Sequence, residues 1–221
     1  MKILYNKHNF NNIINVLNKK NMKIINFLLG CFITFNVNAQ QWSASQLTKA
    51  NTAKEVKELT FEEKQTIMYL NLARMYPKDY KRNEFNKKSA FWSNYRPWNG
   101  FVGKIDSSYV KSLLKTLETM KPINPIYYNS EMYALAKCFS NEKYESGKKG
   151  HERKKCKYGF TAECISYGEK TGLEIINQLL VDHGVESLGH REICLADGYK
   201  YIGVKINKHK TYDFFAILDF N

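Results

Sequence analysis

The chain ends in two strand-like runs, Tyr199 to Ile206 and Tyr212 to Phe220, and this feature constrains its fold most. The segment Asn207-Lys-His-Lys210 lies between them and predicts a hairpin connection. Helical patterns precede this pair and interleave with a further short strand. That order predicts a mixed α/β class with an antiparallel sheet between helices, not a doubly wound parallel sheet.

The segments before the hairpin carry separate start and stop signals. A capping box, Thr60-Phe-Glu-Glu63, opens the first helix, and Pro77 ends or bends it. A later helix has an apolar stripe at positions i, i+3, i+4 and i+7, beginning at Met132. This striped helix is expected to start at Asn129 or Ser130 and to end at Gly147 and Gly150. The remaining expected elements are a helix from Ser108 to Met120, a strand from Ala162 to Tyr167 and a helix from Gly172 to His183.

Residues 1–39 contain the three parts of a secretory signal peptide, counted from Met22. They are a short basic start, a brief apolar run and a small-residue site before Gln40, so we expect cleavage between Ala39 and Gln40. An alternative is a lipoprotein anchored through Cys31, in Leu28-Leu-Gly-Cys31. We divide the chain into the upstream segment and signal peptide (1–39), a polar, weakly patterned N-terminal arm (40–59) and one domain (60–221). The expected location is secreted or periplasmic.

The net charge is +13, and removing residues 1–39, with five Lys and no acid, lowers it to +8. Such a surplus is compatible with binding anionic surfaces but carries no nucleic-acid signature, so no nucleic-acid partner is expected. The densest basic cluster is interpreted as a solvated loop. It comprises Lys148, Lys149, Arg153, Lys154, Lys155 and Lys157.

Four cysteines follow the signal peptide, namely Cys138, Cys156, Cys164 and Cys194. An even number in an exported chain predicts two disulfides, for which three connectivities are possible. The spacing contains no C-x-x-C pair of the kind that binds structural zinc. A monomer is expected.

Three passages together resemble the CAP superfamily of cysteine-rich secretory, antigen 5 and pathogenesis-related proteins, in a bacterial-type member. Tyr69-Leu-Asn-Leu-Ala-Arg74 is similar to the Asn-x-x-Arg of its opening helix. Ile126 to His151 is similar to the helix that delivers a histidine to the family's cleft. Leu188-Gly-His-Arg191, with Tyr199 to Lys205 and Ala216 to Phe220, is similar to its ending. The resemblance implies an α-β-α sandwich.

The resemblance also implies a cleft that gathers two histidines and two acidic residues. His151 and His190 match the histidines, and Glu163 matches one acid. Asp182 and Glu186 are both candidates for the other acid. Arg191 is expected to order the site by pairing with a carboxylate, with Glu163 as a possible partner.

Two imidazoles and a carboxylate suit Zn²⁺ or another divalent cation, with His151 and His190 as ligands. The same groups could instead act in general acid–base chemistry. A third interpretation is structural, in which both histidines only hydrogen-bond the backbone.

Other conspicuous residues receive less functional weight. His183 is interpreted as a helix cap and His209 as a solvated turn residue. Ser187 lacks a Gly-x-Ser-x-Gly elbow, so it is not expected to be a nucleophile. An aromatic sugar-binding platform at Trp92, Tyr95 and Trp98 competes with a packed loop, which we favour.

Three functions follow from these residues. The first is an exported binding module whose cleft takes a small ligand or ion, with a lipid, sterol or protein as partner, as the family resemblance implies. The second is a hydrolase in which His190 and Glu163 activate water. The third is a structural or adhesive extracellular domain.

Overall fold

The terminal hairpin consists of β3 (Tyr201–His209) and β4 (Asp213–Phe220), paired antiparallel, in a computed structural model that describes residues 42–85 and 107–221. The predicted connection was placed too early along the chain. The first strand continues through Asn207 to His209, and the chain turns at residues 210–212. Asp213 adopts a left-handed φ of 61° where the second strand starts. The register pairs His209 with Asp213, so the ladder extends to the turn itself.

Four strands form the sheet in the order β1-β3-β4-β2. β2 (Ala162–Tyr167) pairs antiparallel with β4 and lies at one edge, with the bounds predicted for it. β1 (Tyr127–Tyr128) pairs parallel with β3 at the other edge. The sheet is therefore mixed, because β1 is parallel to its neighbour while the other pairs are antiparallel. The two-residue strand β1 is defined by its partner and carries no sequence pattern of its own.

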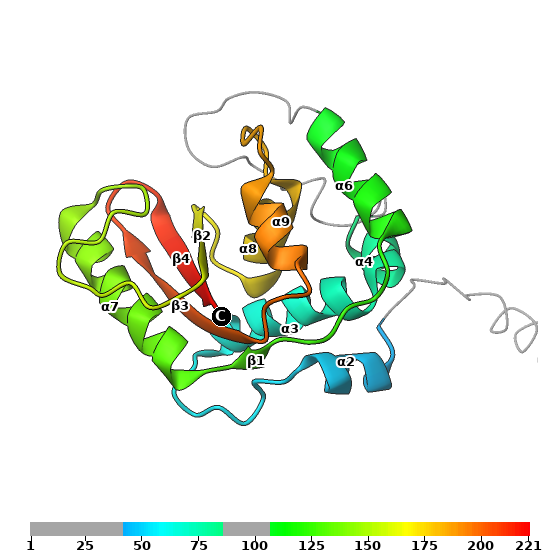
Figure 1. The fold of residues 1–221 in the computed structure, drawn as a ribbon, viewed down its shortest axis with the longest axis horizontal. Coiled ribbons are helices and arrows are strands. Elements are labelled where there is room, and N and C mark those ends of the chain that lie inside the picture. The colour runs from blue at the N-terminus through cyan, green and yellow to red at the C-terminus, as the bar shows by residue number, and fades with distance from the viewer. Residues whose placement is uncertain (1–41, 86–106) are drawn as a thin grey trace, which may run out of the picture. The chain divides into compact units, whose positions relative to one another are not determined.

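Helices cover both faces of the sheet, as the predicted α-β-α sandwich requires. α7 (Ser130–Ser146) packs on β3 and β4 from one side. On the other side lie α3 (Phe61–Met75), α8 (Gly172–Val181) and α9 (Gly189–Leu195). Figure 1 shows the strands between green α7 and the pair formed by yellow-gold α8 and orange α9. The remaining described helices are α2 (Ala44–Ala50), α4 (Pro77–Glu84) and α6 (Ser107–Thr119).

The helix boundaries follow the signals in the sequence. Thr60 and Glu63 form the predicted capping box of α3, and Pro77 begins α4 directly after α3 ends. The Asn129 side chain caps α7 by accepting from two backbone amides. α7 ends at Gly147, whose φ of 66° is the left-handed conformation that glycine adopts without strain.

Residues 42–59 differ from the predicted arm. α2 opens with a capping box between Ser43 and Gln46, and Ala50 and Ala53 are fully buried in the core. The Trp42 indole N–H donates to Glu84 of α4 at 2.6 Å. This segment therefore belongs to the same compact unit as the rest of the domain. Leu59 is also buried in this core, and Trp42, Leu47 and Val56 pack against it.

Alternation along β4 separates two cores. Ala216, Leu218 and Phe220 face the main core beneath α3 and α8, whereas Phe215 and Ile217 face a smaller core under α7. Gly203 of β3 lies against α7 so closely that an added Cβ would be 2.1 Å from the backbone of Met132. Only glycine permits this approach of helix and strand.

The Asn-x-x-Arg motif of α3 forms buried hydrogen bonds with the backbone of several other segments. The buried Asn71 amide donates to the carbonyls of Ala50 and Ile126 and accepts from the Ile126 amide. The Arg74 guanidinium, also fully buried, donates to the carbonyls of four residues. These acceptors are Asn124, Cys194, Ala196 and Tyr199. The motif thus joins α2, β1 and the segment after α9 to one helix.

Several predictions fall outside the described residues. They are the signal peptide with its Ala39–Gln40 cleavage site, the alternative anchor Cys31, and the aromatic set Trp92, Tyr95 and Trp98. Within residues 42–85 and 107–221, no helix has the length and apolar character needed to cross a bilayer.

Candidate functional site

His151 forms a hydrogen-bonded pair with Glu163. His151 lies in the loop after α7, and its Nδ1 is 2.7 Å from Oε1 of Glu163 on β2. A carboxylate accepts, so Nδ1 is the donor and Nε2 is left with a lone pair in the neutral ring. The Glu163 side chain is only 3% exposed, whereas that of His151 is 55% exposed. The buried acid therefore orients an accessible imidazole.

His190 forms a second pair of the same kind with Asp182. Its Nδ1 lies 2.7 Å from Oδ1 of Asp182, and Oδ2 accepts from the His190 backbone amide at 2.9 Å. Asp182 follows α8 in a left-handed conformation and is buried, so a single carboxylate holds both the start of α9 and the ring of His190. The His190 side chain is 24% exposed.

The two pairs meet at the free edge of the sheet. The His151 and His190 ring centroids are 6.5 Å apart, and the ring planes are inclined by 29°. Glu163 and its neighbour Cys164 point to opposite faces of β2, the former to His151 and the latter to the carbonyl of His190. A loop from the α7 layer and a helix from the other layer thus bring the imidazoles together across β2.

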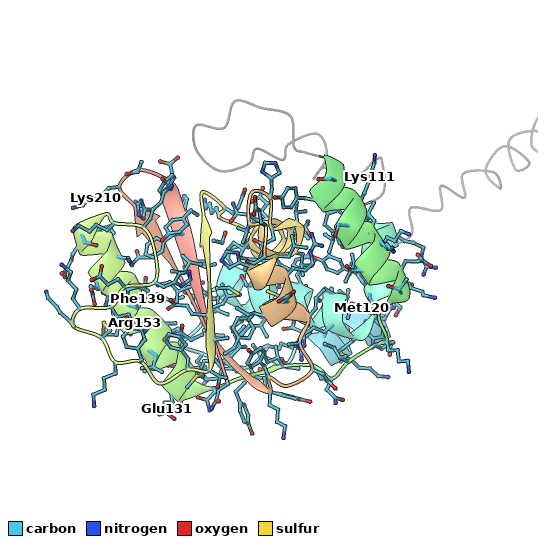
Figure 2. The ribbon with its side chains drawn as sticks, turned by 45° about the horizontal axis from the view of Figure 1, so that its top comes forward. Lys111, Met120, Glu131, Phe139, Arg153 and Lys210 are labelled. Carbon is cyan, nitrogen blue, oxygen red and sulfur yellow. A yellow bond between two sulfur atoms is a disulfide. The ribbon has the colours of Figure 1, made fainter. Side chains whose placement is uncertain are left out.

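A buried arginine supports Glu163 from behind. Arg153 donates to Oε2 of Glu163 and, at 2.9 Å, to both oxygens of Asp219. Glu163 and Asp219 are cross-strand partners in the β2–β4 ladder, so their side chains lie side by side. The guanidinium also packs 4.3 Å from the ring centroid of Phe139, and Figure 2 shows Arg153 beside Phe139.

This cluster places two acidic side chains, Glu163 and Asp219, on one guanidinium. Burial raises the pKa of Asp219 to about 8, with Arg153 opposing the shift and Glu163 adding to it. Because two carboxylates share one guanidinium, a proton on Asp219 reduces their mutual repulsion.

The loop that carries His151 is tied down at several points. Cys138 of α7 and Cys156 form a disulfide. Both oxygens of Glu142 accept from the backbone amides of Lys154 and Lys155, and the Tyr167 hydroxyl accepts from the amide of Gly150. The position of His151 is therefore determined by bonds on either side of it.

The expectation of two disulfides is met for one pair. Cys164 and Cys194 are both fully buried and unbridged. Burial, together with a hydrogen bond to the Cys194 thiol, raises the pKa of the Cys164 thiol. An even cysteine count therefore does not imply complete pairing here.

One prediction about a charged partner needs correction, and one open alternative can be decided. Arg191 does not pair with Glu163; its guanidinium donates to the carbonyls of Leu180, Val181 and Tyr109 and to the Ser112 hydroxyl. It fastens α9 to α8 and α6, and the arginine on Glu163 is Arg153. Of the two candidate acids, Asp182 contacts His190 whereas Glu186 is exposed.

The other two histidines of the described residues, His183 and His209, and Ser187 lie apart from this arrangement. His209 was expected to be solvated but is 4% exposed, because its ring packs among Tyr167, Tyr212 and Phe215. The His183 ring contacts Tyr109 at a centroid distance of 5.2 Å, beyond the end of α8. Ser187 is exposed, and no hydrogen bond found within the described ranges joins its hydroxyl to His190.

The donor set fits a divalent cation held by two imidazoles. No hydrogen bond to Nε2 of His151 or His190 is found among the described residues, so both nitrogens are available. An ion bound tetrahedrally by both Nε2 atoms at about 2.0–2.1 Å places the ring centroids about 5 Å apart. The two rings, 6.5 Å apart in this structure, would therefore move closer together on binding. In the part of the chain that the structure describes, no three His, Cys, Asp or Glu side chains converge as ligands. Glu163 and Asp182 are engaged at Nδ1, the usual place of a supporting carboxylate.

Sequence reasoning missed Arg153 and Asp219. Arg153 stands in a run of lysines and was counted among solvated cations, although it is buried. Asp219 offered a usable signal, because it is a lone charge within the apolar run of β4, at the position expected to face inward.

The family model described as "CAP: Cysteine-rich secretory protein family" matches residues 69–220. The match contains both histidine–carboxylate pairs, the disulfide and the whole described sheet. A comparison with curated proteins finds no match.

Proposed function

Because this chain belongs to the cysteine-rich secretory protein (CAP) family, we propose that it is an exported protein whose His151–His190 site binds a divalent cation such as Zn²⁺. Family membership and the Cys138–Cys156 disulfide support an extracellular protein. Export through the signal peptide ending at Ala39 is part of the proposal, as is a bacterial-type member. A lipid or sterol ligand rests on the family resemblance alone.

One observation carries the metal proposal. Two imidazoles from different layers lie 6.5 Å apart, and each has its Nδ1 engaged by a buried carboxylate. This arrangement fixes the ring orientation and leaves Nε2 as the ligand atom. A purely structural role would need only one hydrogen bond to each ring. It would not explain why Nε2 of both His151 and His190 accepts no hydrogen bond from the described residues.

The residues have distinct tasks in this proposal. His151 and His190 bind the cation, while Glu163 and Asp182 orient the rings. Arg153 and Asp219 keep Glu163 in place. With only two protein ligands, the remaining coordination positions are open to water or a small ligand. A bound Zn²⁺ supplies a Lewis acid that lowers the pKa of coordinated water.

Calorimetry with Zn²⁺ tests this proposal, using His151→Ala, His190→Ala and the double variant. We expect each single variant to bind at least about tenfold more weakly, because each loses one of two protein ligands, and the double variant to lose the site. The control His183→Ala removes a histidine outside the site and should bind as the wild type does. Equal affinity in the wild type and in all three site variants would disprove the site.

A second candidate function is water activation by a histidine–carboxylate pair. The specific observation is the pair of His190 with Asp182, which takes the place of the predicted His190–Glu163 combination. A carboxylate on Nδ1 holds the ring so that Nε2 can accept a proton. Turnover of ester, peptide or glycan substrates by EDTA-treated protein, lost in His190→Ala, would support it. Absence of turnover on all three classes would remove that support.

A further inference from the structure

A hollow lies at the end of α7, on the loop that carries His151. It measures about 310 Å³, the lower end of the range for small-ligand sites. Five lysines line it against three glutamates, so its lining has a surplus of positive charge. The lysines are Lys143, Lys148, Lys149, Lys154 and Lys155.

Lys143 is the most unusual cation in this lining. The residue is only 3% exposed, although lysine is rarely buried without an acidic partner. Its Nζ donates to the carbonyl of Lys149 at 3.1 Å and lies 4.8 Å from the Phe139 ring centroid. No carboxylate within the described ranges forms an ion pair with it. Burial lowers the pKa of Lys143, against the influence of Glu142 and more distant acids.

Two of the three glutamates are already engaged. Glu142 accepts from the backbone amides of Lys154 and Lys155, and Glu145 lies 3.7 Å from the Lys155 Nζ. By contrast, the ammonium groups of Lys148 and Lys154 make no ion pair with a carboxylate in the described part of the chain. Among the lining residues, the single carboxylate of Glu152 is therefore left to neutralise several lysine ammonium groups.

A neighbouring group experiences this positive potential. The pKa of His209 is lowered mainly by burial and to a smaller extent by the charges of Lys149 and Lys143, against a hydrogen bond with the Lys148 backbone that raises it. Lys149 is held in place on this side, with its Nζ 4.4 Å from the Tyr212 ring centroid. The disulfide Cys138–Cys156 anchors the loop that carries the other lysines. The lysine ammonium groups are therefore held near one another by the disulfide and by the packing of Lys149 on Tyr212.

We propose that this hollow binds a phosphate or sulfate group, with Lys143 at its floor and Lys148, Lys149 and Lys154 around it. Ammonium groups bind such groups through charge-assisted hydrogen bonds. The anion supplies the counter-charge that Lys143 lacks. The proposal is independent of the histidine site, since it uses none of that site's residues.

The test is an NMR titration of the protein with inorganic phosphate and with sulfate, at constant ionic strength set with NaCl. We expect amide shifts concentrated in residues 143–155. Lys143→Met, which keeps the side-chain length, should weaken binding at least about tenfold through loss of a charge-assisted hydrogen bond. Lys111→Met is the matched control, because it removes the same charge from an exposed position on α6 and should change affinity little.

Equal effects of the two substitutions, or shifts that NaCl alone reproduces, would overturn the proposal. If Lys143→Met does not fold, Lys148→Gln combined with Lys154→Gln gives the same test at exposed positions. Vesicles of phosphatidylcholine with and without phosphatidic acid then identify the source of the group. Binding that requires phosphatidic acid and is displaced by phosphate indicates a lipid headgroup. Phosphate binding without vesicle binding indicates a free or sugar-borne group.

Discussion

His151 and His190 approach within 6.5 Å between ring centroids, and they do so from opposite layers of the sandwich. Neither histidine is on the strand that separates them. β2 contributes Glu163 to one side and Cys164 to the other, so its alternation distributes contacts to both layers. The edge position of β2 leaves this meeting point open to solvent.

Replacing Asp182 with Asn should weaken Zn²⁺ binding by about 10- to 100-fold, the usual cost of losing a carboxylate behind a ligating imidazole. Asp182 contacts His190 only at Nδ1 and the backbone amide, so the ligand nitrogen itself is kept. Glu186→Gln removes a nearby exposed acid and is the control. Calorimetry should separate the two variants; equal affinities would contradict a supporting role for Asp182.

Stability should fall as pH rises from about 4 to about 8, because the pKa of Asp219 is raised from 3.8 to about 8 by burial. Between these values the folded protein holds a proton that the unfolded chain has released. The free energy of unfolding therefore decreases with pH and levels off above the folded pKa. Urea unfolding across this range should show a shallower slope for Asp219→Asn. An unchanged slope would mean that Asp219 ionises normally.

Removing the disulfide by Cys138→Ser with Cys156→Ser should cost about 3 kcal/mol of unfolding free energy, from the loop entropy of an 18-residue separation. The same change should weaken Zn²⁺ binding, since the cross-linked loop holds His151. Denaturant unfolding and calorimetry measure the two effects. A double variant as stable as the oxidised wild type would count against the bridge.

Asn71→Ala should destabilise the fold by about 2 kcal/mol, because it leaves the buried amide of Ile126 without its acceptor. The carbonyls of Ala50 and Ile126 keep hydrogen bonds from Thr52. Asn141→Ala, on the exposed side of α7, is the matched control and should stay near zero. Chemical denaturation compares the two. A small loss for Asn71→Ala would show that water can replace the amide.

Local signals in the sequence were sufficient for most elements of the fold. The capping box at Thr60, the cap at Asn129 and the break at Pro77 act within a few residues of the chain, so they can be recognised without knowing the fold. β1 could not be found this way, because it is defined by pairing with β3. α2 carried a local signal that sequence reasoning overlooked, the capping box of Ser43 and Gln46, and only the burial of Ala50 against other segments depends on the fold.

The sequence predicted which residues form the candidate site better than it predicted which acid contacts which histidine. His151, His190 and Glu163 were identified through the family resemblance, but no spacing tells which acid faces which imidazole. That choice depends on the side of β2 to which each residue points, and it places Asp182 rather than Glu163 on His190. Arg153 was hidden because its burial arises from the folding of the loop onto Phe139.

X-ray absorption spectroscopy of the Zn²⁺-loaded protein tests the central claim most directly, because it counts the ligands of the bound ion. The wild type should show two imidazole nitrogens at about 2.0–2.1 Å. His151→Ala and His190→Ala should each show one. A shell without imidazole, or an unchanged count in either variant, would contradict a site shared by these two histidines.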